Sequence, residues 1–490
     1  QRLFLHFQEL PVSFHEHYTS GRVISRQVSD IDSISDLFDD GLDALVSAVL
    51  ALILVGAGML LLDWPLALVV LAGFVPLAWL TIWFRRESAA AYRRTRETIA
   101  QVIVQFVETF GGIRAVQAFR REQRNEEIFD SSNAQYAAAS LRSSRVLAVY
   151  APGITLVGNV ATGVVLFYGG LRVIDGDIKV GVLATFLLYL GRFFDPLQDL
   201  SQFYNSFQSA AASLEKISGV LEEPPAVPEP AHPVPLPSRH GPSARTAGRE
   251  VRFGGVRFGY RDTAVLPGLD LTIPAGQTVA LVGATGAGKT TVARLLARFY
   301  DPGQGSVRLD GVDLRDLPDR VLRREVVLVT QENFVLSGSV ADNIRLGRPD
   351  ATQAEVEAAA RAIGADTFIS ALPGGYQADV GKRGGRLSAG QRQLVAFARA
   401  FLAAPAVLVL DEATSLLDIP SEQLVQAALR TILAGRTAMI IAHRLSTVEI
   451  ADRVLVLSGG RVIEDGPPAR LLASEGEYSA LHADWQDSLA

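Results

Sequence analysis

Long apolar runs before about residue 215 constrain the fold of this chain more than any other feature. Leu66–Phe84 passes nineteen residues without a charge. A helix of that length crosses the hydrocarbon core of a membrane, about 30 Å thick, at about 1.5 Å of rise per residue. Residues 146–171 are also uncharged, and residues 42–62 carry only Asp43, near one edge. Because buried helices of a soluble protein imitate one such run more readily than three, we interpret these runs as membrane spans.

A fourth run, over residues 180–209, is less apolar because Arg192 and Asp195 interrupt it. Charged groups are costly in lipid, so within a span these two side chains would face a transport cavity or each other. Alternatively, they lie where the helix has emerged into the cytoplasm, and the sequence leaves both interpretations open. The predicted all-α transmembrane domain occupies residues 1–221. Its spans lie near residues 37–62, 65–90, 141–172 and 180–213.

The charge between these runs predicts the orientation of the domain. Arginines crowd the segment between the second and third spans, and few basic residues occur in the opposite loops. Since positive charge marks the cytoplasmic side, this segment should be cytoplasmic. Its helical apolar spacing predicts that both spans continue as helices about 40 Å into the cytoplasm, with a short helix near Ala118–Phe129 at the tip. The arginines are Arg85, Arg86, Arg93, Arg94, Arg96, Arg114, Arg120, Arg121, Arg124, Arg142 and Arg145.

Other features narrow the function mainly by exclusion. A net charge of −6 argues against a nucleic-acid partner. The absence of cysteine excludes disulfides, thiolate metal sites and thiol catalysis. The first forty residues are amphipathic and lack an initiator Met, so we expect a cytoplasmic helix that a missing segment precedes. Residues 222–250 are rich in Pro, Ser, Gly and Ala, which predicts an extended, mobile tether that buries almost nothing.

A phosphate-binding loop follows this tether. Val279–Val282 is a short apolar strand candidate that leads into a G-x-x-x-x-G-K-T match starting at Gly283. The glycines allow backbone N–H groups to point into one concavity, and the next helix directs its positive end at the phosphates. Lys289 would neutralise the outer phosphates, and Thr290 would offer its hydroxyl to Mg²⁺. The predicted nucleotide-binding residues of this loop are Gly283, Thr285, Gly286, Gly288, Lys289, Thr290 and Thr291.

A second apolar strand candidate, Val407–Leu410, ends in two carboxylates. Asp411 and Glu412 would lie at the carboxyl end of that strand, the edge where α/β sheets collect their ligands. Asp411 would then hold Mg²⁺ through its water shell, and Glu412 would polarise an attacking water. Such a pair is weak evidence alone, but after a phosphate-binding loop a merely solvated strand end becomes a poor alternative.

The sequence Leu387–Gln393 (LSAGQRQ) resembles the signature motif of ATP-binding-cassette (ABC) proteins. The resemblance implies that residues 251–490 form an α/β nucleotide-binding domain with ATP and Mg²⁺ as cofactors. Further motifs fall in the family's order, although each alone has an ordinary structural explanation. Tyr260 is similar to the aromatic that stacks on adenine, Gln331 to the glutamine that senses Mg²⁺ and the lytic water, Asp418 to the D-loop aspartate, and His443 to the switch histidine at the γ-phosphate. The predicted catalytic residues are Glu412, His443 and Gln331, and the predicted metal-binding residues are Thr290, Gln331 and Asp411.

The signature motif also predicts pairing. Ser388, Gly390 and Gln391 begin a helix whose N-terminus can bind an anion, although the chain's own phosphate-binding loop already has such a helix. The resemblance implies that this second N-terminus grips ATP bound to another cassette, head to tail, so that hydrolysis requires a dimer. Binding would close the two cassettes and hydrolysis would release them.

Together, the two domains resemble an exporter-type half-transporter over almost the whole chain. Such halves have six spans, so the four predicted here would be the third to the sixth. The segment Ala118–Phe129 would be the coupling helix that contacts a partner's cassette, and Phe14–Arg26 a second coupling region. The resemblance implies a multi-pass integral protein of a bacterial inner membrane, with its ATP-binding domain in the cytoplasm.

Two departures from the family pattern favour a heterodimer over a homodimer. Ala389 replaces the usual glycine of the signature, and Leu416 stands where alanine is common in the D-loop. Related non-standard signatures occur in heterodimeric pumps with one weakened site. Because Glu412, Gln331 and His443 are present, any defect would fall on the partner's site, which this signature completes.

We therefore predict ATP-driven transport by alternating access, as one half of a dimeric transporter. The expected partners are a second half-transporter, membrane lipid and a small amphipathic substrate such as a lipid, fatty acid or drug. The alternative is an ATP-binding regulatory subunit with little turnover of its own. A soluble cassette ATPase of the DNA-repair kind would need a coiled coil between the two ATP strands, and the sequence contains none.

Overall fold

The computed structural model describes residues 1–225, 227–238, 247–261, 263–331, 333–411, 419–442, 444–474 and 476–487. The side chains of residues 192–195, 197, 198, 201 and 419–421 lie outside this description. The chain forms two compact units, one of Gly21–Glu222 and one that joins Gln1–Ser20 to Glu223–Ala490. The predicted fold class, a helical transmembrane domain followed by an α/β cassette, is confirmed.

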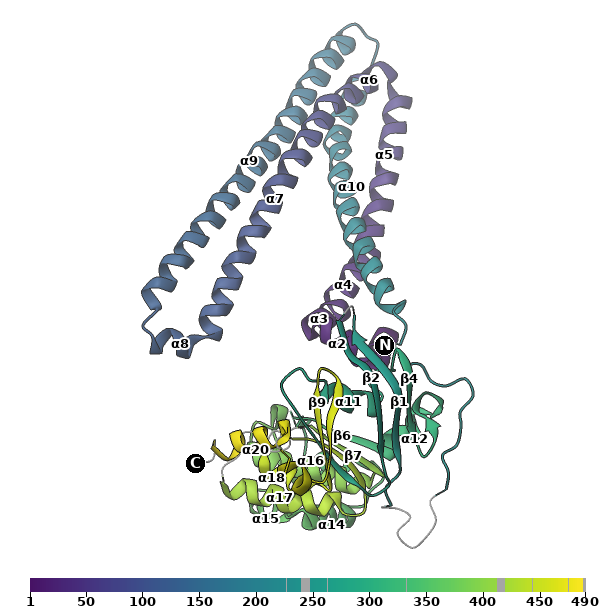
Figure 1. Ribbon diagram of the computed structural model, residues 1–490. Helices are drawn as coiled ribbons and strands as arrows, with labels where there is room; N and C mark the ends of the chain where they lie inside the picture. The colour runs from purple at the N-terminus through teal and green to yellow at the C-terminus, as the bar shows by residue number, and fades with distance from the viewer. Residues whose placement is uncertain are drawn as a thin grey trace. The chain divides into compact units, whose positions relative to one another are not determined.

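The first unit is helical throughout (Figure 1). Helix α7 packs along α9, and α5 packs along α10. Asp63 separates α5 from α6 because its side chain accepts a hydrogen bond from the Leu66 N–H (2.9 Å) and so caps the second helix. The elements are α3 (Ser20–Gln27), α4 (Ser29–Asp36), the π-helical turn η1 (Leu37–Gly41), α5 (Leu42–Leu62), α6 (Trp64–Ala72), α7 (Phe74–Gly111), α8 (Ile113–Ala118), α9 (Glu122–Ile174) and α10 (Val180–Leu221).

Three helical stretches among the described residues are long and apolar enough to cross a membrane. They are Ser20–Leu62, Trp64–Gly111 and Glu122–Ile174. In each of them, only 11–22% of the most apolar 18-residue stretch is buried inside the protein. Most of this apolar surface is therefore available to lipid. The fourth predicted span stays a prediction, because the apolar part of α10 is the shorter Val180–Gly191. Arg192 and Asp195 lie on α10, but their side chains are outside the described set.

The prediction of a short helix near Ala118–Phe129 was wrong. Helix α7 ends at Gly111, the short helix α8 follows at once, and Glu122 already belongs to α9. Two consecutive glycines favour the end of a helix, and their position sets the turn earlier than the polar tip sequence suggested. Helix α9 has 53 residues. At about 1.5 Å per residue it is about 80 Å long, far more than a bilayer core, as the extended helices of the prediction require.

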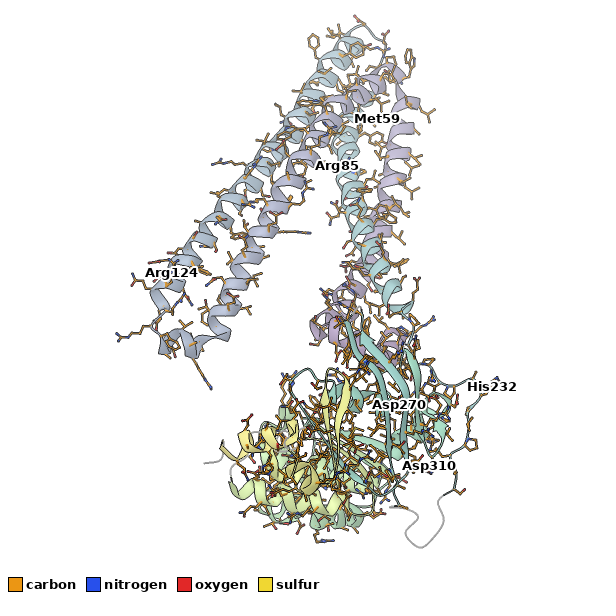
Figure 2. The ribbon with its side chains drawn as sticks, viewed as in Figure 1. Met59, Arg85, Arg124, His232, Asp270 and Asp310 are labelled. Carbon is orange, nitrogen blue, oxygen red and sulfur yellow. The ribbon has the colours of Figure 1, made fainter. Side chains whose placement is uncertain are left out.

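A cluster of buried side chains joins α5, α6, α9 and α10. An ion pair accompanies it, in which Arg172 Nη1 donates to both Asp63 oxygens at 2.6 and 2.7 Å. Figure 2 shows Met59 of this cluster and Arg124 toward opposite ends of the helices. The four helices are therefore tied together at the end away from the α8 turn. The cluster consists of Met59, Leu66, Ala67, Val70, Ala161, Val165, Leu183, Phe186 and Leu190.

The cassette unit contains two sheets. One is six-stranded, with the order β10-β9-β3-β8-β7-β6, and its strands from β9 to β6 are parallel. The other is antiparallel, with the order β2-β1-β4-β5. The strands are β1 (Val251–Tyr260), β2 (Thr263–Ile273), β3 (Thr278–Val282), β4 (Gln304–Leu309), β5 (Val312–Asp313), β6 (Val326–Val329), β7 (Val407–Asp411), β8 (Thr437–Ile441), β9 (Arg453–Ser458) and β10 (Arg461–Gly466).

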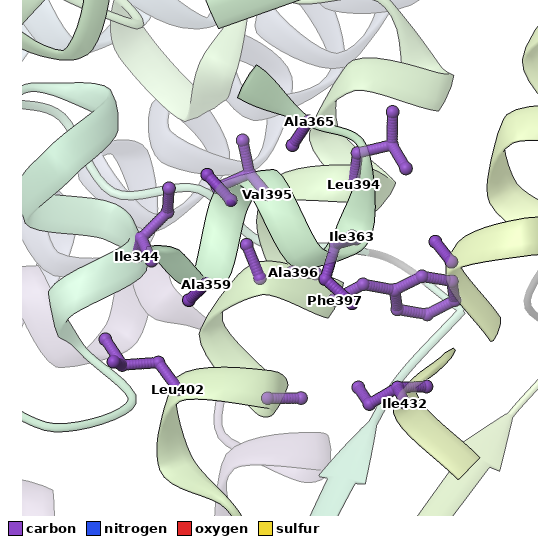
Figure 3. Close-up of a cluster of buried hydrophobic side chains, with 14 of the residues drawn as sticks. Ile344, Ala359, Ile363, Ala365, Leu394, Val395, Ala396, Phe397, Leu402 and Ile432 are labelled. Atoms are coloured by element: carbon purple, nitrogen blue, oxygen red, sulfur yellow. The ribbon is translucent and has the colours of Figure 1, made fainter. Parts of the chain in front are cut away.

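Helices cover both faces of the parallel sheet. Alternate residues of β7 show this, since Leu408 and Leu410 enter one core cluster while Val407 and Val409 enter the other. Figure 3 shows part of the first cluster, with Phe397 and Ile432 among its labelled side chains. The helices are α1 (Arg2–Glu9), α2 (Val12–His17), α11 (Lys289–Leu296), α12 (Asp319–Glu325), α13 (Val340–Arg345), α14 (Gln353–Ile363), α15 (Asp366–Ala371), α16 (Ala389–Ala403), α17 (Ile419–Leu433), α18 (Leu445–Val448), α19 (Pro468–Leu472) and α20 (Glu477–Asp487).

The expectation that residues 222–250 bury almost nothing is confirmed for residues 222–225 and 227–238, none of which is buried, but it was wrong for Arg249. The segment nevertheless docks on the cassette, which a free tether would not do. Leu236 packs against a core cluster of the cassette. The Val234 N–H donates to the Asp316 carbonyl (2.9 Å), and Arg298 donates to the Pro228 carbonyl (2.9 Å). Composition alone missed this docking because the partners lie about 70 or more positions away in sequence.

Arg249, at the end of the same segment, fixes it most firmly. Its side chain is 5% exposed and donates to Glu325 (3.0 Å), to Asp310 (2.5 Å) and to the Pro237 carbonyl (3.0 Å). Glu325 is itself buried. Removing the guanidinium would therefore leave a buried carboxylate without its cation.

We expect Arg249→Met to destabilise the cassette by about 3 kcal/mol, because the buried Glu325 carboxylate loses its ion pair with the guanidinium. The matched control is Arg252→Met on the exposed side of β1, which should change stability by about 0.5 kcal/mol or less. The thermal unfolding midpoints of the purified chains measure the difference. Equal midpoints for the two variants would show that the Arg249 cluster contributes no more than surface charge.

Candidate functional site

The predicted site residues follow strands that end at one edge of the parallel sheet. Leu281 of β3 lies opposite Ile441 of β8, and Ile441 lies opposite Asp411 of β7. Val329, the last residue of β6, pairs with Leu410, one residue before Asp411. Because parallel strands present their carboxyl ends together, the segments that follow β3, β6, β7 and β8 start at a common edge.

The phosphate-binding loop starts with a close backbone approach. Gly283 has φ +139°, and a Cβ there would lie 2.1 Å from the Leu457 carbonyl oxygen of β9. Gly286 and Gly288 also adopt positive φ (+85° and +102°), the region that favours glycine. Thr285 and Gly286 are exposed, and Gly288 caps the N-terminus of α11. The loop therefore presents its backbone outward at the positive end of a helix.

Lys289, the first residue of α11, points back over this loop. Its side chain is 5% exposed, and Nζ donates to the carbonyls of Gly283 (2.6 Å) and Ala284 (3.0 Å). Thr290 is exposed on the first turn of the helix, whereas Thr291 is buried. The structure thus brings together one cation, one exposed hydroxyl and outward backbone groups, the groups that bind and orient a polyphosphate.

Tyr260 lies next to the same helix. Its ring contacts the rings of Phe258 and Tyr300 at centroid distances of 5.0 and 5.3 Å. Its hydroxyl accepts from Thr291 Oγ1 and from Arg294 Nη1, both at 3.4 Å. The structure therefore brings the predicted adenine-stacking residue to α11, the helix that follows the phosphate-binding loop.

The remaining predicted catalytic residues are described only in part. Asp411 is the last residue of β7 and is partly buried. Gln331 is exposed in the bend after β6. Glu412, Asp418 and His443 lie outside the described residues.

The signature helix α16 begins with a capping box. Ser388 Oγ accepts from the Gln391 N–H (3.2 Å), and Gln391 Oε1 accepts from the Ser388 N–H (2.9 Å). Ser388 and Ala389 are exposed, while Gly390 is buried. Sequence reasoning missed this local role of Gln391, although the spacing S-x-x-Q before an apolar run is a known signal for it.

Sequence reasoning also missed a cavity of ≈ 270 Å³ beside the end of β6. It is lined by Val329 at the end of β6, by Asn333 and Phe334 after the strand, and by Ala396 and Arg399 of α16. Phe334 is 57% exposed. Burial lowers the pKa of Arg399, which donates to the Asn343 carbonyl (2.9 Å). The apolar residues that follow Gln331 were the only sequence signal for this cavity.

Two family models match the chain. Residues 1–197 match the ABC transporter transmembrane region, and residues 266–415 match the ABC transporter domain. The first match covers Gln1–Ser20 and most of the helical unit, and the second covers part of the cassette.

Individual relatives match along almost the whole chain. An uncharacterized ABC transporter ATP-binding protein, YknV of Bacillus subtilis, is 38% identical over 98% of this chain and 78% of its own length. A fatty acid ABC transporter ATP-binding/permease protein of Mycobacterium bovis is 38% identical over 96% of this chain and 73% of its own. The solved structure of a bacterial Atm1-family ABC exporter with ATP bound superposes with a TM-score of 0.80 and 30% identity, covering 98% of this chain and 83% of that one.

The two glycines at the start of the loop supply a matched test of the site geometry. Gly283→Ala should lower the unfolding midpoint clearly, because its Cβ meets the Leu457 carbonyl. Gly286→Ala has open space around the new Cβ and pays only the strain of a positive φ, about 1 kcal/mol. Thermal unfolding of both purified variants makes the comparison. If Gly286→Ala were the more destabilising, the described loop geometry would be wrong.

Proposed function

The chain belongs to the ABC transporter family as a half-transporter of the exporter type, and from that premise we propose that it moves an amphipathic substrate across the membrane by alternating access. It is a multi-pass integral membrane protein with a cytoplasmic ATP-binding domain, and an ATPase coupled to transport. The observation that carries the proposal is the combination, on one chain, of apolar spanning helices and a phosphate-binding loop with an outward backbone.

The proposed ATP site uses the loop from Gly283 to Thr291, with Tyr260 stacking on the adenine. The Lys289 ammonium is already held over the loop by two carbonyls, so it can turn to phosphate oxygens without crossing the site. Thr290 and Asp411 supply oxygen donors, the kind that Mg²⁺ prefers, and Gln331 offers a third. Bound Mg²⁺ would neutralise phosphate charge during the transfer. The roles proposed for Glu412, Asp418 and His443 rest on the family motifs.

ABC half-transporters work as dimers. We propose that the exposed start of α16, at Ser388, contacts ATP on the partner's cassette, with Gly390 and Gln391 forming the same helix start. Ala389 is exposed at that end, so its methyl group would face the partner's nucleotide. This supports a heterodimer in which the partner's site is the weaker one.

The cavity beside β6 gives the proposed partner a second point of contact. Its lining includes Thr330, the residue before Gln331, and the exposed Phe334. Phe119 follows α8 and is 78% exposed. It is an apolar side chain on the part of the chain that would act as the coupling helix. We propose that the α8 turn of the second half-transporter binds in this cavity. This contact would link the membrane helices of the partner to Gln331, the residue proposed to sense Mg²⁺ and the attacking water.

A lipid, fatty acid or drug is the proposed substrate class. The fatty acid transporter relative supports an amphipathic substrate. In α10, Arg192 would supply a cation for an anionic head group if the helix lines the path.

Replacing Glu412 tests the ATPase assignment. Glu412→Gln should lower ATP turnover of the reconstituted dimer by about 100-fold or more, because the general base is lost while the side-chain size is kept. Glu357→Gln on α14, away from the sheet edge, is the matched control and should retain turnover. Phosphate release from ATP is the readout. Turnover that Glu412→Gln leaves unchanged would favour the regulatory-subunit alternative.

Replacing Arg192 tests the transport path. Arg192→Ala should change substrate-stimulated ATPase activity more than basal activity, because the side chain would contact cargo and not nucleotide. Arg94→Ala, at an exposed surface pair on α7, serves as the control. The assay measures ATPase activity against a panel of lipids, fatty acids and drugs. Stimulation curves that match those of the unmodified protein for every compound would remove Arg192 from the path.

A further inference from the structure

Glu16 on α2 joins the segment before the first span to the cassette, within one compact unit. One carboxylate oxygen pairs with Arg294 Nη1 at 3.0 Å. The other accepts a hydrogen bond from the Tyr300 hydroxyl at 2.8 Å. Both side chains of the Glu16–Arg294 pair are only about one third exposed (35% and 33%). A single carboxylate therefore holds a cation and a phenol in fixed positions against the cassette.

Both partners of Glu16 contact Tyr260. Arg294 donates to the Tyr260 hydroxyl at 3.4 Å, and the Tyr300 ring meets the Tyr260 ring edge-on at 5.3 Å. Phe258 closes the group, with its ring 5.0 Å from Tyr260 and 5.5 Å from Tyr300. The Tyr260 ring is thus held by two aromatic neighbours at its face and edges and by α11 at its hydroxyl.

We propose that Glu16 is a positioning residue for nucleotide binding, which sets the orientation of the Tyr260 ring through Arg294 and Tyr300. The inference rests on the proposed function, because Tyr260 is the residue proposed to stack on adenine. A ring fixed before the base arrives needs no ordering when it binds, so the affinity for the adenine part of ATP depends on this network. The phosphate-binding loop does not contact Glu16, so the polyphosphate part of the affinity is independent of it.

The chemistry of the network supports a positioning role over a plain surface contact. Burial, and then the hydrogen bond to Glu16, raise the pKa of Tyr300 well above its ordinary value, so this phenol stays a donor across the physiological range. Arg294 is charged under the same conditions. The network therefore keeps one arrangement at neutral pH, in which Glu16 accepts from both Arg294 and Tyr300.

The test separates the adenine part of binding from the phosphate part. Equilibrium binding of ATP and of inorganic tripolyphosphate, which lacks a base, is measured on the reconstituted full chain without Mg²⁺, so that ATP binds but is not hydrolysed. Glu16→Ala should weaken ATP binding by about tenfold, the size expected for a disturbed base–aromatic stack. It should leave tripolyphosphate binding within about twofold. Glu16→Asp, which keeps the charge, should recover part of the loss.

Two controls keep the result specific. His17→Ala alters the next residue of α2, which is exposed and whose ring bonds only to the Ser13 carbonyl among the described contacts, so ATP binding should be retained. Tyr300→Phe keeps the ring and removes its bond to Glu16, so the loss should be smaller than for Glu16→Ala. The proposal fails if Glu16→Ala leaves ATP binding unchanged, or if it weakens ATP and tripolyphosphate equally. The failure of this proposal can be told apart from the failure of the proposed function. If Glu412→Gln left ATP hydrolysis unchanged, the proposed function would fail, but the binding test on Glu16 would still be valid because it involves no turnover.

Discussion

The register of the parallel sheet is the constraint on which the rest of the cassette depends. β3, β8, β7 and β6 pair in parallel with matched ends, so that Val282, Asp411 and the residues beside them finish at one edge. The apolar side chains of β7 and β8 are divided between two cores, so a slip of one residue in either strand would exchange its two buried faces. The polar residues at this edge, such as Asp411, are therefore positioned by the burial of apolar side chains that take no part in the chemistry.

Local sequence signals predicted the features that depend on local physics. Uncharged runs such as Leu66–Phe84 became spanning helices, because a long apolar helix has few alternatives to lipid. The glycines of the loop from Gly283 to Gly288 adopt the positive φ that the motif requires. Two consecutive glycines, Gly111 and Gly112, are also present in the sequence. The choice between a turn there and a turn nearer Ala118 depends on how α7 and α9 pack. That pairing is a long-range property, and the short helix was therefore misplaced.

Contacts between distant segments were the part that the sequence could not supply. The proline-rich segment before β1 has the composition of a free tether, yet Leu236 packs against the core of the cassette and Arg249 is buried there. The partners of Arg249 are Asp310 and Glu325, which no pattern links to it. In the same way, Glu16 had no distinguishing neighbour in sequence, and its role depends on Arg294 and Tyr300, more than 270 residues away. For the site, motif order identified residues that the structure brings together, such as Tyr260 and Thr291, but not what holds them.

Helix α11 explains how one short element can serve both ends of the proposed nucleotide. It has eight residues. Lys289 and Thr290 on its first turn face the phosphate side, and Arg294, one turn later, contacts Tyr260 and Glu16. Within the cassette unit, α11 therefore contacts both the carbonyls of the loop and the network around Tyr260.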